Sequence, residues 1–266
     1  MDLQGDSGLK YGEIIASAIE YVADVLGLVD LTRQGAHALV GVQAHGEYPA
    51  ESEERVSRAR EAGVLAEREL ARGFPLLHSH ALVGAWGAVE AAVADVCVES
   101  LRLRPALALS EPLSKVKVNA GLLLHMGEAE RARYILDEYS NGQRVGGRSG
   151  VSQFELRLDA VGLGGLVDPN IKKVLHLAKA MRNVIAHRGG VVDDRFVEVC
   201  PDAGFVAGQP LHVSYEQVCS VVLALVHYLE EVNNRVLQRE GRDCREVKLP
   251  GGRTTQDLLE SFGVDR

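Results

Sequence analysis

The sequence predicts an all-α protein, a helical bundle with a small β-hairpin insertion and an extra N-terminal helical region. Several long segments repeat apolar residues at the three- and four-residue spacing of amphipathic helices. Residues that start and stop helices bracket these segments. Aromatic residues make up only 5% of the chain, fewer than a β-sandwich or β-barrel normally uses. The 266 residues are enough for one large domain or two small ones with a substantial core.

Two helices are expected in an N-terminal helical extension, residues 1–73. Residues 12–28 place their apolar side chains on one face of the first helix. Residues 50–72 interleave charges of both signs, which predicts a solvated amphipathic helix; a partner-binding helix is the alternative.

A helical core is expected over residues 74–240, and it opens with the longest helical pattern, residues 76–103. Ser110 is placed to cap a further helix that begins near Pro112. The next helix is expected over residues 128–139.

Clear signals bound a helix at residues 169–187. Asp168 is a favourable N-cap residue, and Pro169 suits the first helical position. Gly189 and Gly190 follow, and glycine commonly ends a helix.

The next segments predict a small β-hairpin and a long final helix. RFVEV (195–199) and LHVS (211–214) carry strand-like residues on either side of a Pro/Gly-rich link. Ser214 and Gln217 have the spacing of a capping box that opens the final helix. A polar C-terminal tail with one short helix is expected over residues 241–266.

Charge and cysteine content restrict the function. The net charge of −8 argues against sequence-blind binding along a nucleic-acid backbone but leaves room for a small basic cleft. The four cysteines are far apart and form no CxxC pair, which is typical of free thiols in a reducing cytosol. The N-terminus has no signal-peptide pattern, and no run approaches the ~18 apolar residues of a membrane span. We therefore expect a cytoplasmic protein with no membrane partner.

The motifs favour neither a cofactor nor a metal. The glycine-rich stretch 141–150 lacks the GK[ST] of a phosphate-binding loop, so a flexible connector is expected. The GLGG at 162–165 does not follow a strand, as a dinucleotide fingerprint requires. His78 and His80 would point roughly 200° apart on a helix, with no acidic or cysteine cluster beside them.

One face of the helix at 169–187 carries an unusual set of polar side chains. Between Asp168 and Asp193 there are five Lys or Arg residues and no acidic residue, which reverses the charge of the chain locally and predicts an anion site. At 100° per residue, the following side chains form one polar ribbon beside the apolar stripe: Lys172, His176, Lys179, Asn183 and His187.

Arg182 falls inside the apolar stripe of the same helix, where a buried guanidinium needs a carboxylate partner. Glu90 lies in the middle of the apolar stripe of the helix at 76–103, so the two helices are expected to pack with Glu90 against Arg182. This pair either fixes the register of the helices or holds Arg182 toward a phosphate. His187 lies roughly 140° from Arg182, so the length of Arg182, relaxation at the helix end or a two-fold dimer would have to bring them together.

The sequence RNVIAH at the end of this helix, followed by RGG, resembles the signature of the HEPN superfamily. ALVGAWGAVEAAVADV (81–96) is similar to the first core helix of that family, and VDPNIKKVLHLAKAMRNVIAHRGG (167–190) to its motif-bearing helix. The final helix around VLALVHYLEEV (222–232) also fits, so the resemblance covers residues 74–240.

The resemblance implies a HEPN-type helical bundle that works as a homodimer. Many members are metal-independent endoribonucleases of bacterial toxin–antitoxin or anti-phage systems, which implies RNA as substrate and an antitoxin or defence-system protein as partner. The catalytic residues implied are Arg182, Asn183 and His187, supported by Glu90. The expected RNA-binding residues are Lys172, His176, Lys179 and Arg188. Some family toxins carry a modified tyrosine two residues after the histidine; Gly189 stands there, so that regulation is not expected.

The residue types suit RNA cleavage without a metal, in which a 2′-OH attacks the neighbouring phosphorus. Histidine titrates near neutrality, and a permanently charged arginine stabilises the phosphoryl oxygens. DNA, which lacks the 2′-OH, would not be cleaved. Two other classes remain open: a non-catalytic HEPN-like module for RNA or nucleotide binding or oligomerisation, and a purely structural helical protein.

Overall fold

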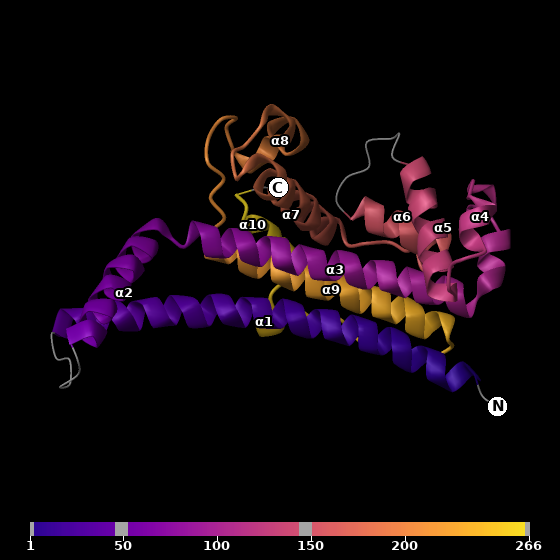
Figure 1. Cartoon of the computed structure of the whole chain (residues 1–266), viewed down its shortest axis with the longest axis horizontal. Helices are drawn as coiled ribbons and strands as arrows, with labels where there is room; N and C mark the ends of the chain where they lie inside the picture. Colours follow the sequence, from indigo (N-terminus) through magenta and orange to yellow (C-terminus); the bar gives the residue numbers. More distant parts are fainter. Residues whose placement is uncertain (1–2, 46–52, 144–150, 264–266) are drawn as a thin grey trace.

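The computed structural model describes residues 3–45, 53–143 and 151–263, which are mostly helical (Figure 1). Ten α-helices occur there: α1 (Leu3–His45), α2 (Glu53–Arg72), α3 (Pro75–Leu103), α4 (Ala120–Leu123), α5 (Glu128–Gly142), α6 (Ser152–Ala160), α7 (Pro169–Arg188), α8 (Asp194–Val199), α9 (Tyr215–Arg239) and α10 (Thr255–Glu260). Four 3-10 turns accompany them: η1 (Pro105–Leu109), η2 (Leu113–Lys115), η3 (Pro201–Ala203) and η4 (Pro250–Gly252). The predicted all-α class is confirmed.

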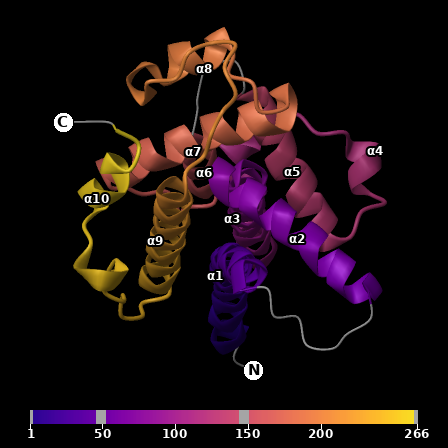
Figure 2. The same ribbon diagram turned by 90° about the vertical axis from the view of Figure 1, so that its left-hand side faces the viewer.

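Three long helices, α1, α3 and α9, run side by side and form the body of the molecule (Figure 1). The helix α7 crosses over α3 and α9, with α8 lying on its outer side and α10 beside it (Figure 2). Trp86 of α3, Met181 of α7 and Tyr228 of α9 are among the fully buried side chains of the single large core that these helices share.

Residues 11–29 of α1 pack into this same core, through Tyr11, Ile15 and Val22 among others. Its later part and α2 enclose a small second cluster of Ala36, Ala66 and Phe74. The division of the chain at residue 73 stays a prediction, and so does a separate C-terminal tail. Leu258 and Phe262 of that tail also join the large core.

The central helix α3 has the length and apolar character that a membrane-spanning helix would need. Within the fold, 56% of its most apolar window is buried by the surrounding helices. Burial on all sides accounts for an apolar composition in the core helix of a bundle, so this feature alone is weak evidence for a membrane segment.

The predicted β-hairpin is wrong. Residues 195–199 lie in α8, because the Asp193 carboxylate accepts a hydrogen bond from the Phe196 amide at 2.9 Å and starts a helix there. In the described residues, β pairing is limited to an isolated antiparallel bridge between Val191 and Pro210. Leu211 is buried in an extended segment whose amide donates to the Gly190 carbonyl at 2.7 Å, so this chain covers the core without forming a strand.

Several helix boundaries follow the sequence signals closely. The Asp168 carboxylate caps α7 by accepting from the amides of Asn170 and Ile171, and Gly189 ends the helix at a φ of 60°. The capping box of Ser214 and Gln217 opens α9. Ser110 does not cap a helix, because a 3-10 turn follows Pro112 in place of the expected helix. Most of the predicted connector at 141–150 lies outside the described residues.

Candidate functional site

The polar face of α7 opens onto a cleft of about 650 Å³. The helix α7 supplies most of the polar side chains that line it, and these belong to the predicted set: His176, Lys179, Asn183, His187 and Arg188. The side chains of the predicted polar ribbon therefore lie on one face over the last three turns of the helix. Lys172 is exposed in the first turn of α7 and does not line the cleft, so the structure does not support its grouping with the other RNA-binding candidates.

The short helix α8 forms the facing wall of the cleft, with Arg195, Phe196 and Val199 among its lining residues. It is held by contacts at both ends. Arg188 Nε donates to Asp193 Oδ2 at 3.1 Å at the start of α8, and His176 Nε2 lies 3.1 Å from the Val199 carbonyl oxygen at its end. Between these contacts Phe196 is buried in the core, so the wall is anchored at three points.

Lys179 lines the cleft and is half-buried, and its ammonium group donates to Gln153 Oε1 of α6. Burial lowers the pKa of Lys179 to about 8, since desolvation disfavours the charged amine. Glu90 nearby raises this pKa and Arg182 lowers it. The cleft thus contains an amine whose charge changes just above neutrality.

Arg182 makes the predicted contact with Glu90, with Nη2 and Oε2 3.5 Å apart. The pair is less buried than the sequence suggested, because the two side chains retain 28% and 46% of their exposure. Arg182 Nη1 also donates to Asn183 Oδ1 at 3.2 Å, whereas its Nε is buried without a hydrogen-bond partner. Arg182 is not among the residues that line the cleft, whereas its neighbour Asn183 and His187 are.

His187 is exposed in the last turn of α7 and lines the cleft. Because Gly189 and Gly190 turn the chain away with positive φ values, no further helical residues cover the imidazole. The imidazole of His187 is therefore open to solvent.

Charge in the cleft is strongly one-sided. Five basic side chains line it, namely His176, Lys179, His187, Arg188 and Arg195. Asp193 is the single carboxylate among the described lining residues, and it is occupied by the α8 amide and by Arg188. Basic side chains on facing walls of a cleft favour the binding of an anion.

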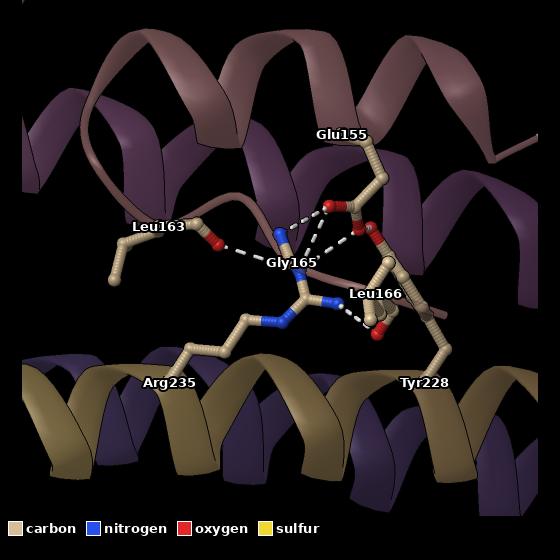
Figure 3. Close-up of polar contacts among 6 residues, drawn as sticks. All are labelled: Glu155, Leu163, Gly165, Leu166, Tyr228 and Arg235. Atoms are coloured by element: carbon tan, nitrogen blue, oxygen red, sulfur yellow. Dashed lines mark hydrogen bonds and ion pairs between the residues drawn. The ribbon is translucent and has the colours of Figure 1, made fainter. Parts of the chain in front are cut away.

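The helix α6, which brings Gln153 into the cleft, is tied to α9 by a partly buried ion pair (Figure 3). Glu155 accepts from Arg235 Nη1 at 2.9 Å on both oxygens, and from the Tyr228 hydroxyl at 2.7 Å. Arg235 also donates to the carbonyls of Leu163 and Leu166, and the Gly165 amide donates to Glu155. With every charged group hydrogen-bonded, the pair fixes α6 and the 163–166 segment against α9.

Sequence reasoning missed Gln153, Asp193 and Arg195. Asp193 and Arg195 line the cleft because residues 194–199 form a helix. In the predicted strand, Arg195 and Phe196 would point to opposite faces of a sheet. The Asp193 N-cap was the available signal. Gln153 has none, because its place in the cleft follows from the packing of α6.

His78, one of the two histidines weighed as metal ligands, is buried with its Nδ1 2.9 Å from the Val213 carbonyl oxygen. No cluster of three or more His, Cys, Asp or Glu side chains within residues 3–45, 53–143 and 151–263 could hold a metal ion.

Comparisons with protein-family models, curated proteins and solved structures give no match to this chain. The fold and the cleft define a helical protein with a cleft lined mainly by basic side chains.

Proposed function

We propose that this chain is a metal-independent endoribonuclease of HEPN type, which cleaves RNA by attack of a 2′-OH on the neighbouring phosphorus. The observation that carries the proposal is the α7 cleft, where the exposed imidazole of His187 stands among four other basic side chains. An imidazole can exchange protons near neutral pH, and the surrounding cations suit the charge of a phosphodiester.

In the proposed reaction His187 removes the proton of the 2′-OH as the oxygen attacks phosphorus. The P–O5′ bond breaks, the leaving 5′ oxygen takes up a proton from solvent water, and a 2′,3′-cyclic phosphate remains on the upstream fragment. Because Asn183 Oδ1 accepts from Arg182, the Asn183 amide group presents its NH2 as a donor that can orient the phosphate. Lys179 and Arg188 hold the RNA backbone.

The proposed active enzyme is a homodimer. Arg182 contacts Glu90 and does not line the cleft, so in this proposal its guanidinium acts in a composite site where two copies of the motif face each other. A cytoplasmic role in bacterial toxin or anti-phage defence, with an antitoxin or defence-system protein as partner, belongs to the same proposal and rests on the resemblance of the motif.

A non-catalytic RNA- or nucleotide-binding module is the second candidate. The contacts of Arg182 with Glu90 and Asn183 favour it, because a guanidinium held inside its own protomer serves structure better than catalysis.

The test uses single-stranded RNA incubated with the pure protein in EDTA. The nuclease is supported if cyclic-phosphate ends form, if a 2′-deoxy substitution at the cleaved position blocks the reaction, and if His187→Ala abolishes it while His125→Ala, an exposed histidine elsewhere, does not. Binding to the cleft without cleavage identifies the binding module. Neither binding nor cleavage by the folded protein rejects both.

A further inference from the structure

The cleft has a basic residue on the wall facing α7 that no motif marks, and this is Arg195 of α8. Its side chain is exposed at the start of α8 and lines the cleft together with His187 and Arg188. An anion in the cleft would therefore meet positive charge from both sides.

The basic residues of the cleft differ in what they already contact. Arg188 is engaged by Asp193, and Lys179 by Gln153. His176 contacts the Val199 carbonyl. Arg195 makes no ion pair with any part of the chain that the structure describes. It can bind an anion without first breaking an internal contact.

Arg195 also lies on a helix, α8, that is held in place by several contacts. The helix α8 is capped by Asp193, and it is bound to α7 through the contacts at Arg188 and His176. Phe196, the next residue, is buried in the core. The guanidinium is thus presented from a fixed wall, and a planar guanidinium can bind two phosphate oxygens at once.

We infer that Arg195 is a substrate-positioning residue that binds a phosphate of the RNA backbone across the cleft from His187. This inference rests on the proposed function for its ligand. It adds to the site a residue outside the Arg182–His187 motif, on the wall that α8 forms.

The test measures binding separately from cleavage, using a fluorescent single-stranded 2′-O-methyl oligoribonucleotide. This probe keeps the phosphates and bases but has no 2′-OH to attack, so the whole wild-type protein can be titrated without turnover. Arg195→Ala is compared with Arg195→Lys, and with Lys173→Ala, which removes one charge from an exposed position of α7 outside the cleft.

We expect Arg195→Ala to raise the Kd about tenfold and to reduce the slope of log K against log salt by about 0.7, the value for one phosphate contact on a single strand. Arg195→Lys should restore the slope but only part of the affinity, because a lysine cannot make the two-point contact. Lys173→Ala should change the Kd less than twofold.

The outcomes separate this inference from the proposed function. If Lys179→Ala and Arg188→Ala weaken binding but Arg195→Ala changes neither Kd nor slope, the role of Arg195 is rejected. If no cleft variant affects binding, or the wild type does not bind the probe, the inference also fails. If Arg195→Ala behaves as expected but unmodified RNA is not cleaved, the positioning role stands and the nuclease does not.

Discussion

Arg188 and Asp193 join the end of α7 to the start of α8, with Arg188 Nε donating to Asp193 Oδ2 at 3.1 Å. The other oxygen of the same carboxylate caps α8 through the Phe196 amide. The Asp193 side chain therefore caps α8, which is the wall of the cleft facing α7. It also partly neutralises Arg188, a basic residue of the same cleft.

These two tasks of Asp193 can be separated by substitution. Asn is as good an N-cap as Asp, so Asp193→Asn should keep the free energy of unfolding within about 0.5 kcal/mol of wild type. It frees Arg188 from its carboxylate, and binding of the 2′-O-methyl probe should tighten by up to about fivefold. Asp193→Ala removes the cap as well and should cost about 1 kcal/mol of stability. Urea unfolding and probe titration check both variants; weaker binding by Asp193→Asn would contradict this role.

The lowered pKa of Lys179 predicts a pH dependence of binding. The amine is charged below its pKa of about 8 and neutral above it, so affinity for a polyanion should fall as the pH rises from 7 to 9. Lys179→Arg keeps its charge over this range, and its Kd should change much less with pH. Probe titrations at constant ionic strength make the comparison, and equal pH profiles for the two proteins would exclude Lys179 as the source.

His78 should make the fold less stable in mild acid. Burial lowers its pKa below the usual 6.5, with Arg33 adding to the effect, while the hydrogen bond to Val213 and the charge of Glu216 oppose it. In the unfolded chain His78 takes up a proton below about pH 6.5, whereas in the fold it resists until lower pH. The free energy of unfolding should therefore decrease as the pH falls below about 6.5. His78→Gln should flatten this decrease in urea titrations between pH 5 and 8, and an unchanged slope would contradict the assignment.

The partly buried ion pair shown in Figure 3 leaves no room for a side chain at Gly165. A Cβ at this position would lie 2.6 Å from Arg235 Nε and 2.9 Å from its Cζ. Because Arg235 is held by Glu155 and two carbonyls, Gly165→Ala should disrupt the ion pair and cost about 1–3 kcal/mol in thermal or urea unfolding. Gly87→Ala in α3 is the matched control: nothing lies within 4 Å of its Cβ, and stability should rise by about 0.5–1 kcal/mol.

Substitution of Glu90 distinguishes a structural from a functional role of its ion pair with Arg182. Since both side chains are partly exposed, Glu90→Gln should change the free energy of unfolding by less than about 1 kcal/mol. If Glu90 holds Arg182 for catalysis, the same variant should lower the cleavage rate about tenfold or more with little change in probe affinity. A cleavage rate equal to that of wild type would leave the pair with only its packing role.

The helix ends were predictable where a short-range chemical signal specifies them. Asp168, Pro169 and Gly189 bound α7 as expected, because capping depends on residues within one turn. RFVEV was misassigned because five residues with alternating apolar side chains suit either structure, and the Asp193 cap decided in favour of helix.

The candidate site was predictable along one helix and not across helices. Periodicity placed His176, Lys179, Asn183 and His187 on one face of α7, and the cleft lies there. Lys172 shares the face but sits beyond the reach of α8, and sequence does not show where a neighbouring wall ends. Arg182 was correctly paired with Glu90, yet its exposure depends on how closely α3 and α7 pack.

Both walls of the cleft come from one short stretch of chain. Only the five residues from Gly189 to Asp193 separate α7 from α8, and they contain two glycines with positive φ. An insertion or deletion in this link would re-aim α8 while the contacts of α7 with α3 and α9 stayed in place. The width of the opening can therefore change without a matching change in the rest of the molecule.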